Sequence, residues 1–73
     1  MRIREFRHAV EAEFGDRGPA LLHDLVLGEV GGMTAAEALE AGAPIDDVWL
    51  ALCRATDVPP SRRHGVGLRD PQR

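Results

Sequence analysis

Apolar residues recur at helical spacing near the start of the chain. Ile3, Phe6, Val10 and Phe14 follow one another at steps of three, four and four residues, which places them on one side of a helix. Gly15 follows directly and provides the left-handed conformation with which many helices end. The pattern predicts a first helix from about residue 3 to residue 14.

A second apolar stretch follows Gly18-Pro19 and predicts a helix over about residues 19–30, which the Gly31-Gly32 pair ends with a sharp turn. Two residues do not fit this helix. Leu27 falls on its polar side, and Glu29 falls inside its apolar stripe near the end. The stripe consists of Leu21, Leu22, Leu25, Val26 and Val30.

Two further helices are predicted after this turn. Thr34 and Glu37 have the spacing of a capping box, in which each side chain binds the backbone amide of the other residue, so a short helix is expected over about residues 35–41. Pro44 opens the last helix, which ends at Val58-Pro59-Pro60. Its apolar stripe consists of Ile45, Val48, Trp49, Leu52 and Thr56.

These elements predict an all-α fold, a small bundle of four helices in which the last two form a helix-turn-helix-like hairpin. Residues 1–60 are expected to form a single helical domain. Residues 61–73 are rich in Gly, Pro and Arg and contain only Val66 and Leu68 as apolar residues, so a flexible basic tail is expected there.

The length of 73 residues limits the size of the core. Cys53 is the single cysteine and cannot form an internal disulfide, so stability must come from packing or from a partner. The N-terminal segment contains no apolar run of the signal-peptide or membrane-anchor type, and a cytoplasmic protein is expected.

Charge is distributed unevenly along the chain. Residues 1–58 contain five Arg and eleven Asp or Glu, which gives 5 − 11 = −6, while residues 59–73 contain four Arg and one Asp, which gives 4 − 1 = +3. A basic arm can bind phosphates or an acidic protein surface, but with only four Arg interrupted by Asp70 a solvated terminus is the favoured interpretation. The basic residues of this arm are Arg62, Arg63, Arg69 and Arg73.

The segment from Thr34 to Asp57 has the outline of a DNA-reading helix-turn-helix, but its charge argues against this function. Arg54 is its single basic residue, whereas duplex DNA attracts clustered positive charge. A structural helical hairpin is the favoured interpretation. The acidic residues of the segment near the turn are Glu37, Glu40, Asp46 and Asp47.

The remaining polar residues give little support for catalysis. Cys53 is expected to be an inert buried thiol, and Trp49 a packing anchor. His8, His23 and His64 do not have the spacing of metal ligands. Glu29 is expected either to reach solvent or to form a salt bridge with an arginine of the last helix or the tail. The sequence therefore predicts no enzyme, catalytic residue, metal or cofactor.

Taken together, several short motifs resemble a known family. The chain is similar, over about residues 1–63, to the small actinobacterial proteins grouped as domain of unknown function 3046. The resemblance implies a cytoplasmic protein whose gene is commonly placed near those for the recombinase of homologous repair and its regulator, and it implies no activity. The motifs include Phe14-Gly15, His23-Asp24, Gly31-Gly32, Val48-Trp49 and Val58-Pro59.

Two hypotheses about function follow. The first is a non-catalytic protein-interaction or regulatory module, because the core is small and because Leu27 and Leu50 fall on otherwise polar faces. The second is nucleic-acid binding through the Arg-rich tail or the helix-turn-helix-like hairpin.

Overall fold

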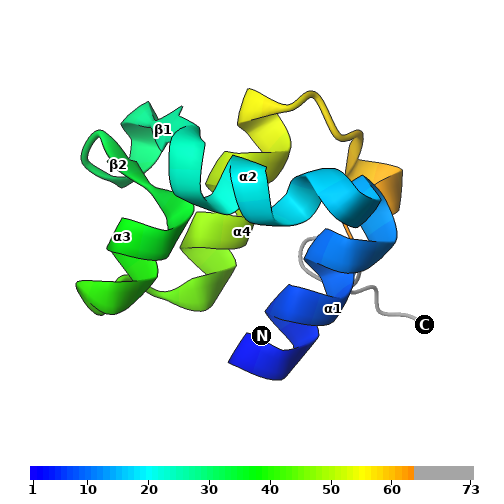
Figure 1. Cartoon of the computed structure of the whole chain (residues 1–73), viewed down its shortest axis with the longest axis horizontal. Helices are drawn as coiled ribbons and strands as arrows, with labels where there is room; N and C mark the ends of the chain where they lie inside the picture. The colour runs from blue at the N-terminus through cyan, green and yellow to red at the C-terminus, as the bar shows by residue number, and fades with distance from the viewer. Residues whose placement is uncertain (64–73) are drawn as a thin grey trace.

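A computed structural model describes residues 1–63 and shows a mostly helical chain with a small antiparallel sheet (Figure 1). The helices pack around α4, and the sheet lies at one end of the molecule, beside α3. In chain order the elements are α1 (Ile3–Phe14), the 3-10 turn η1 (Gly15–Arg17), α2 (Gly18–Asp24), β1 (Val26–Leu27), the 3-10 turn η2 (Gly28–Val30), β2 (Met33–Thr34), α3 (Ala35–Glu40), α4 (Ile45–Ala55) and the 3-10 turn η3 (Pro60–Arg62).

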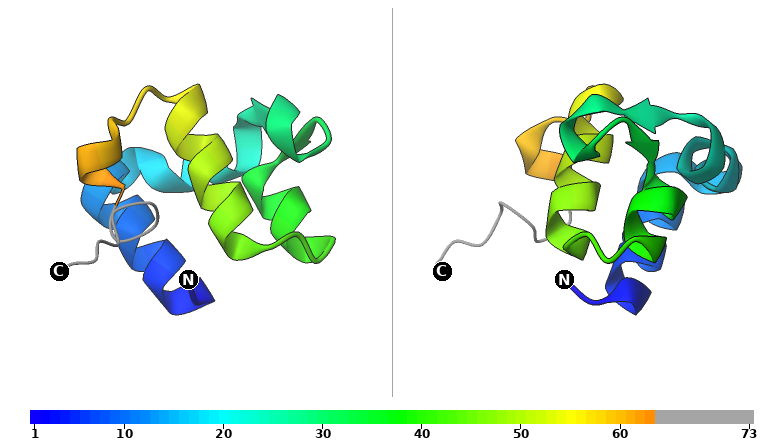
Figure 2. Two further views of the ribbon diagram at one scale, coloured as in Figure 1. Left: turned by 180° about the vertical axis from the view of Figure 1, so that it is seen from behind. Right: turned by 90° about the vertical axis from the view of Figure 1, so that its left-hand side faces the viewer.

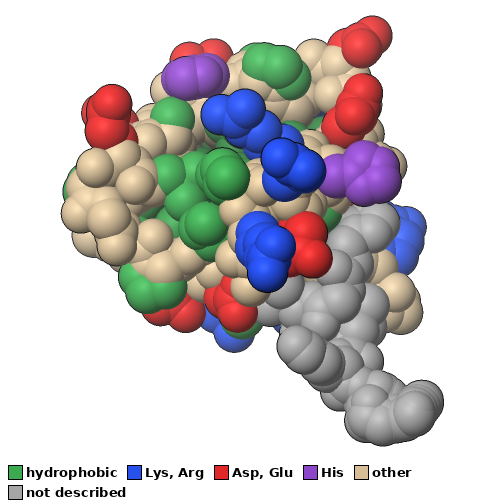
Figure 3. All heavy atoms as spheres, turned by 90° about the horizontal axis from the view of Figure 1, so that it is seen from below, with side chains coloured by type: hydrophobic (Ala, Val, Ile, Leu, Met, Phe, Trp, Pro, Cys, Tyr) green, Lys and Arg blue, Asp and Glu red, His purple; other side chains and the backbone are tan. Residues whose placement is uncertain are grey.

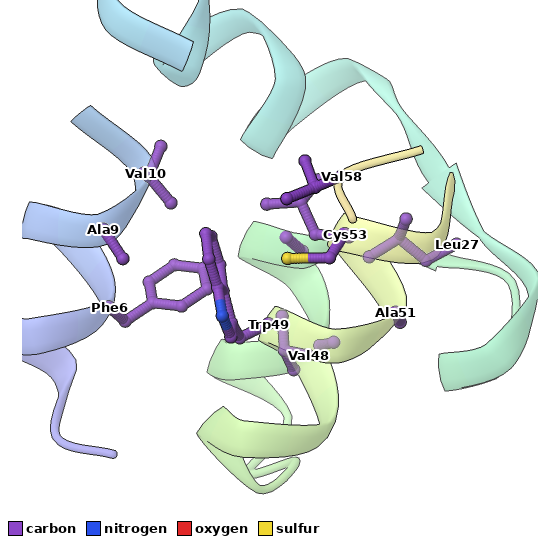
Figure 4. Close-up of a cluster of buried hydrophobic side chains, with 12 residues drawn as sticks. Phe6, Ala9, Val10, Leu27, Val48, Trp49, Ala51, Cys53 and Val58 are labelled. Carbon is purple, nitrogen blue, oxygen red and sulfur yellow. The ribbon is translucent and has the colours of Figure 1, made fainter. Parts of the chain in front are cut away.

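The core forms where α1 crosses α4. Trp49 is fully buried, and its indole ring meets the rings of Phe6 and Phe14 edge to face, with centroid distances of 6.1 and 6.4 Å. Figure 4 shows the side chains of α1 pointing at this indole from one side and Cys53 and Val58 lying beyond it. The predicted first helix and the packing role of Trp49 are therefore confirmed.

The predicted second helix is wrong in its second half. α2 ends at Asp24, and the chain then forms a hairpin in which Val26 pairs with Thr34 and Leu27 with Met33 (Figure 2). Gly28 and the β-branched Val26 are poor helix residues, and the turn uses Gly31 and Gly32 at φ +81° and +75°.

This hairpin corrects the interpretation of Leu27. In a strand, neighbouring side chains point to opposite faces, so Leu27 enters the core at 2% exposure while Val26 points outward at 59%. Leu27 is a core residue and not part of an exposed surface. The mostly helical fold is confirmed, but the sheet makes the all-α prediction wrong here, and a four-helix bundle is not confirmed.

Thr34 links the hairpin to α3 through the predicted capping box, which the structure confirms. The Glu37 amide donates to Thr34 Oγ1 at 3.2 Å, and the Thr34 amide donates to Glu37 Oε1 at 3.0 Å. The two bonds satisfy amides that the first turn of a helix leaves unpaired. α3 then ends near Gly42, and the short turn to Pro44 brings α4 alongside it.

We expect Thr34→Ala to lower the free energy of unfolding by about 1 kcal/mol, because it removes the acceptor for the Glu37 amide. Thr34→Ser keeps the hydroxyl and should lose much less. Urea denaturation followed by circular dichroism measures both variants. Equal midpoints for Thr34→Ala and the wild type would show that the capping box contributes nothing to stability.

The chain after α4 returns to α1 and closes over the edge of the core. The Trp49 indole N–H donates to the Arg63 carbonyl at 2.8 Å, Arg62 lies 3.0 Å from the Glu13 carboxylate, and Arg63 Nε donates to the Val58 carbonyl. Residues 61 and 62, predicted to belong to a flexible tail, therefore lie in the ordered turn η3. The remaining tail prediction, for residues 64–73, lies outside the described residues.

Candidate functional site

An open groove runs between α1, α2 and α3. The charged and polar residues at its sides are Arg7 on α1, His23 on α2, and Glu37 and Glu40 on α3. The face seen in Figure 3 carries a group of hydrophobic side chains beside arginine and histidine side chains. The apolar residues that line the groove are Ile3, Phe6, Leu22, Ala36 and Leu39.

A second hollow extends this groove along α1 toward η1. The two share Arg7, Leu22 and His23 in their walls, so they lie next to each other across α1 and α2. Its far end is bordered by Glu11 and Asp16. We call the combined depression the α1–α2–α3 groove.

The α1–α2–α3 groove has an apolar floor and charges of both signs on its rim. Ile3 is 43% exposed, a high value for an isoleucine that begins a core-facing stripe. Within residues 1–63, Arg7 forms no ion pair, so its guanidinium donors face solvent at the middle of the groove. Such a depression suits an amphipathic segment with apolar anchors and polar flanks.

A separate surface lies over the outer side of α4. Arg54 and Glu29 form a salt bridge across it, with 2.6 Å between Arg54 Nη1 and Glu29 Oε1, which confirms the salt-bridge alternative for Glu29. Both side chains are about half exposed, so the pair adds little to stability. Leu50 is half buried beside this pair, in a hollow that Val30 and Pro44 also line.

The outer side of α4 is acidic where a DNA-reading helix would need positive charge. Asp46 and Asp47 are exposed at its first turn, Asp46 binds the N-terminal ammonium of Met1 at 2.6 Å, and Arg54 is held by Glu29. Fixed negative charge at this position repels the phosphate backbone.

Cys53 is fully buried beside Trp49, as predicted for an inert thiol (Figure 4). Burial raises the pKa of the Cys53 thiol to about 11, with Glu13 adding to this rise and Arg63 and Arg54 opposing it. The thiolate, which is the reactive form, is therefore scarce at neutral pH.

We expect Cys53 in the folded protein to react with a disulfide reagent at pH 8 at least about 100 times more slowly than in denaturant, because both the raised pKa and burial suppress attack. Since the unfolded thiol loses its proton near pH 9 and the folded one near 11, stability should also fall as the pH rises through this interval. Equal reaction rates in native buffer and in denaturant would contradict this.

The histidines are not gathered into a metal site in the described part of the chain. His8 and His23 are exposed on different helices, and residues 1–63 contain no group of three or more His, Cys, Asp or Glu side chains placed to hold a metal ion. His64 lies outside the described residues. Likewise, no helix among residues 1–63 is long and apolar enough to cross a membrane.

Comparison with known proteins identifies the family. The model of the family described as "Protein of unknown function (DUF3046)" matches residues 1–61. The chain belongs to the DUF3046 family. No curated protein and no solved structure matches it. The matched segment contains every residue of the α1–α2–α3 groove and of the α4 surface.

The groove of this DUF3046 protein was missed by the sequence interpretation. The apolar stripe of the first helix placed Ile3 in the core, and the broad stripe of the second helix did the same for Leu22. The position of Arg7 was a sign of the groove. It lies one helical turn from Ile3 on the same side of α1, and a charged residue there indicates that this side reaches solvent near Ile3. Leu39, which completes the floor, lay on a helix too short to show a pattern.

Proposed function

We propose that this protein is a non-catalytic interaction module that binds a partner protein in the α1–α2–α3 groove. The observation that carries the proposal is the groove itself, an apolar depression across three helices with Arg7, which forms no ion pair within residues 1–63, at its middle. An amphipathic helix that docks in such a groove would bury Ile3, Leu22 and Leu39 and satisfy the charged rim.

The size and shape of the groove favour a protein segment over a small molecule. Both of its hollows are open to solvent, and neither is an enclosed cavity. Small-molecule sites are concave pockets that enclose most of the ligand, with a few convergent polar groups. Here the polar groups border the floor on opposite sides, as in the polar rim of a protein interface.

Charge favours this function over the nucleic-acid alternative. The outer side of α4 is acidic, and two of the tail arginines are engaged within the protein, Arg62 with Glu13 and Arg63 with the Val58 carbonyl. The Glu13 carboxylate offsets the charge of Arg62, which lowers the attraction of this side chain for a phosphate. We therefore expect no measurable binding of a duplex at physiological salt by a chain ending at residue 63.

Affinity capture from the native cells with purified protein as bait tests the proposal. Ile3→Glu places a carboxylate on the exposed floor of the groove and should abolish recovery of the partner recovered by the wild type. Val26→Glu likewise places a carboxylate at an exposed β-branched residue, the other large apolar side chain exposed among residues 1–63; it lies outside the groove and should leave recovery unchanged. Circular dichroism checks that both variants are folded.

Equal recovery of the same partner by the wild type and Ile3→Glu would overturn the groove as the binding surface. Steep loss of recovery with added salt or with nuclease treatment would instead point to nucleic acid as the bound molecule.

A further inference from the structure

The outer side of α4 carries a short pattern of charges and apolar residues that is complementary to itself. Asp47, Leu50 and Arg54 follow one another at steps of three and four residues, so they lie on one strip of the helix, in which the two charged side chains are exposed and Leu50 is half buried. Along the chain the strip is negative at Asp47, apolar at Leu50 and positive at Arg54. Read in the opposite direction, it presents the matching sequence of positive, apolar, negative.

We infer that a second copy of this chain docks on this strip, with the two α4 helices antiparallel about a twofold axis. A closed twofold interface uses the same patch on both subunits, so each contact occurs twice. With Leu50 near the axis, Asp47 meets Arg54 of the partner subunit, and Arg54 meets Asp47 of the partner subunit.

The surroundings of the strip fit this arrangement. Glu29 holds Arg54 at 2.6 Å through a single nitrogen, and a guanidinium has further N–H donors for a second carboxylate. Within residues 1–63, Asp47 forms no ion pair and no side-chain hydrogen bond, so its carboxylate is available. The hollow beside Leu50, with Val30, Ala43 and Pro44 on its walls, can receive the leucine of a second copy.

Charge complementarity selects a second copy over nucleic acid or a uniformly charged partner. Duplex DNA would meet Asp46 and Asp47 at the start of the helix and be repelled. Asp47 and Arg54 lie three and four residues from Leu50, so an antiparallel copy presents the opposite charge to each of them, and Glu29 lies beside the strip, on η2, rather than on α4. The interface is small and belongs to the weak class, with an expected dissociation constant on the order of 10 μM.

This inference is independent of the proposed function, because the strip and the α1–α2–α3 groove share no residue. Analytical ultracentrifugation of the full chain, from about 1 to 500 μM, should show a reversible equilibrium between monomer and dimer. A wild-type protein that stays monomeric over this range would overturn the inference.

Two charge variants test the geometry. Asp47→Arg makes both ends of the strip positive and Arg54→Asp makes both ends negative, so each variant alone should dimerise at least about 10 times more weakly than the wild type. Mixed in equal amounts, they present opposite charges at every contact and should form a heterodimer about as strong as the wild-type dimer.

Asp24→Arg and Arg17→Asp are matched controls, since they make the same changes at exposed residues outside this surface, and they should dimerise like the wild type. Recovery of the heterodimer cannot arise from unfolding of either variant, so it reports on the pairing alone. A mixture that remains monomeric, or single variants that dimerise like the wild type, would overturn the antiparallel pairing.

Discussion

Trp49→Ala is expected to lower the free energy of unfolding by about 3–5 kcal/mol, the largest effect of any single substitution considered for this protein. The indole is fully buried, contacts the rings of Phe6 and Phe14, and donates a hydrogen bond to the Arg63 carbonyl. For a domain of this size, such a loss lowers the melting temperature by about 20 °C or prevents folding at 25 °C.

Trp49→Phe is the graded control, because phenylalanine keeps an aromatic ring in the core but removes the N–H donor. Its cost should be smaller than that of Trp49→Ala. Thermal unfolding followed by circular dichroism at 222 nm measures both variants without depending on the tryptophan signal. A melting temperature for Trp49→Ala within about 5 °C of the wild type would show that the indole does not organise the core.

The second large effect is expected at Gly18, where alanine should destabilise the protein by about 2 kcal/mol although alanine is normally the better helix residue. Gly18 is buried where α2 meets α1, and a Cβ atom built there lies 2.7 Å from Val10 Cγ1. Valine has little rotamer freedom in a helix, so the contact can be relieved only if the two helices move apart.

Gly28→Ala is the matched control for this substitution. A Cβ atom at Gly28 has no neighbour within 4 Å, and its φ angle is not in the left-handed region, so stability should change by less than about 0.5 kcal/mol. In the double variant Val10→Ala/Gly18→Ala the clash between the new Cβ atom and Val10 Cγ1 is gone. The double variant should therefore lose less stability than the sum of the losses of the two single variants. Additive costs, or a Gly18→Ala variant as stable as the wild type, would refute the close approach of the helices.

Much of the fold follows from local sequence signals. The stripe of the first helix, the capping box of Thr34 and Glu37, and the stripe with Trp49 each depend on residues a few positions apart, and the structure confirms all three. Gly42 and Pro44 likewise mark the turn between α3 and α4 in the sequence itself.

The sequence contained a sign that the predicted second helix was wrong in its second half, but this sign was interpreted as an irregularity within a helix. Leu27 on the polar side and Glu29 in the apolar stripe are anomalies for a period of 3.6 residues. In the observed structure Leu27 alternates with Val26 along a strand, and Glu29 is exposed beside Arg54. Pairing with Met33 and Thr34 decides between strand and helix here, and the local pattern does not contain that pairing.

The surfaces could be predicted less well than the core. A groove depends on how three helices are placed, and the sequence pattern shows only which side of each helix is apolar. Residues at the edge of a stripe, such as Ile3 and Leu22, therefore look the same as core residues until the helices are packed. The Glu29–Arg54 salt bridge was among the expected alternatives, but its partner could be chosen only from the structure.

Site-specific photo-crosslinking in the native cells tests the proposed interaction groove most directly. A benzophenone amino acid at Ile3 places the reactive group on the floor of the groove, and the same group at Val26, which is more exposed than Ile3, lies outside it. We predict a crosslinked partner protein from position 3 and none from position 26. The same adducts from both positions, or none from position 3, would contradict the groove as the site of interaction.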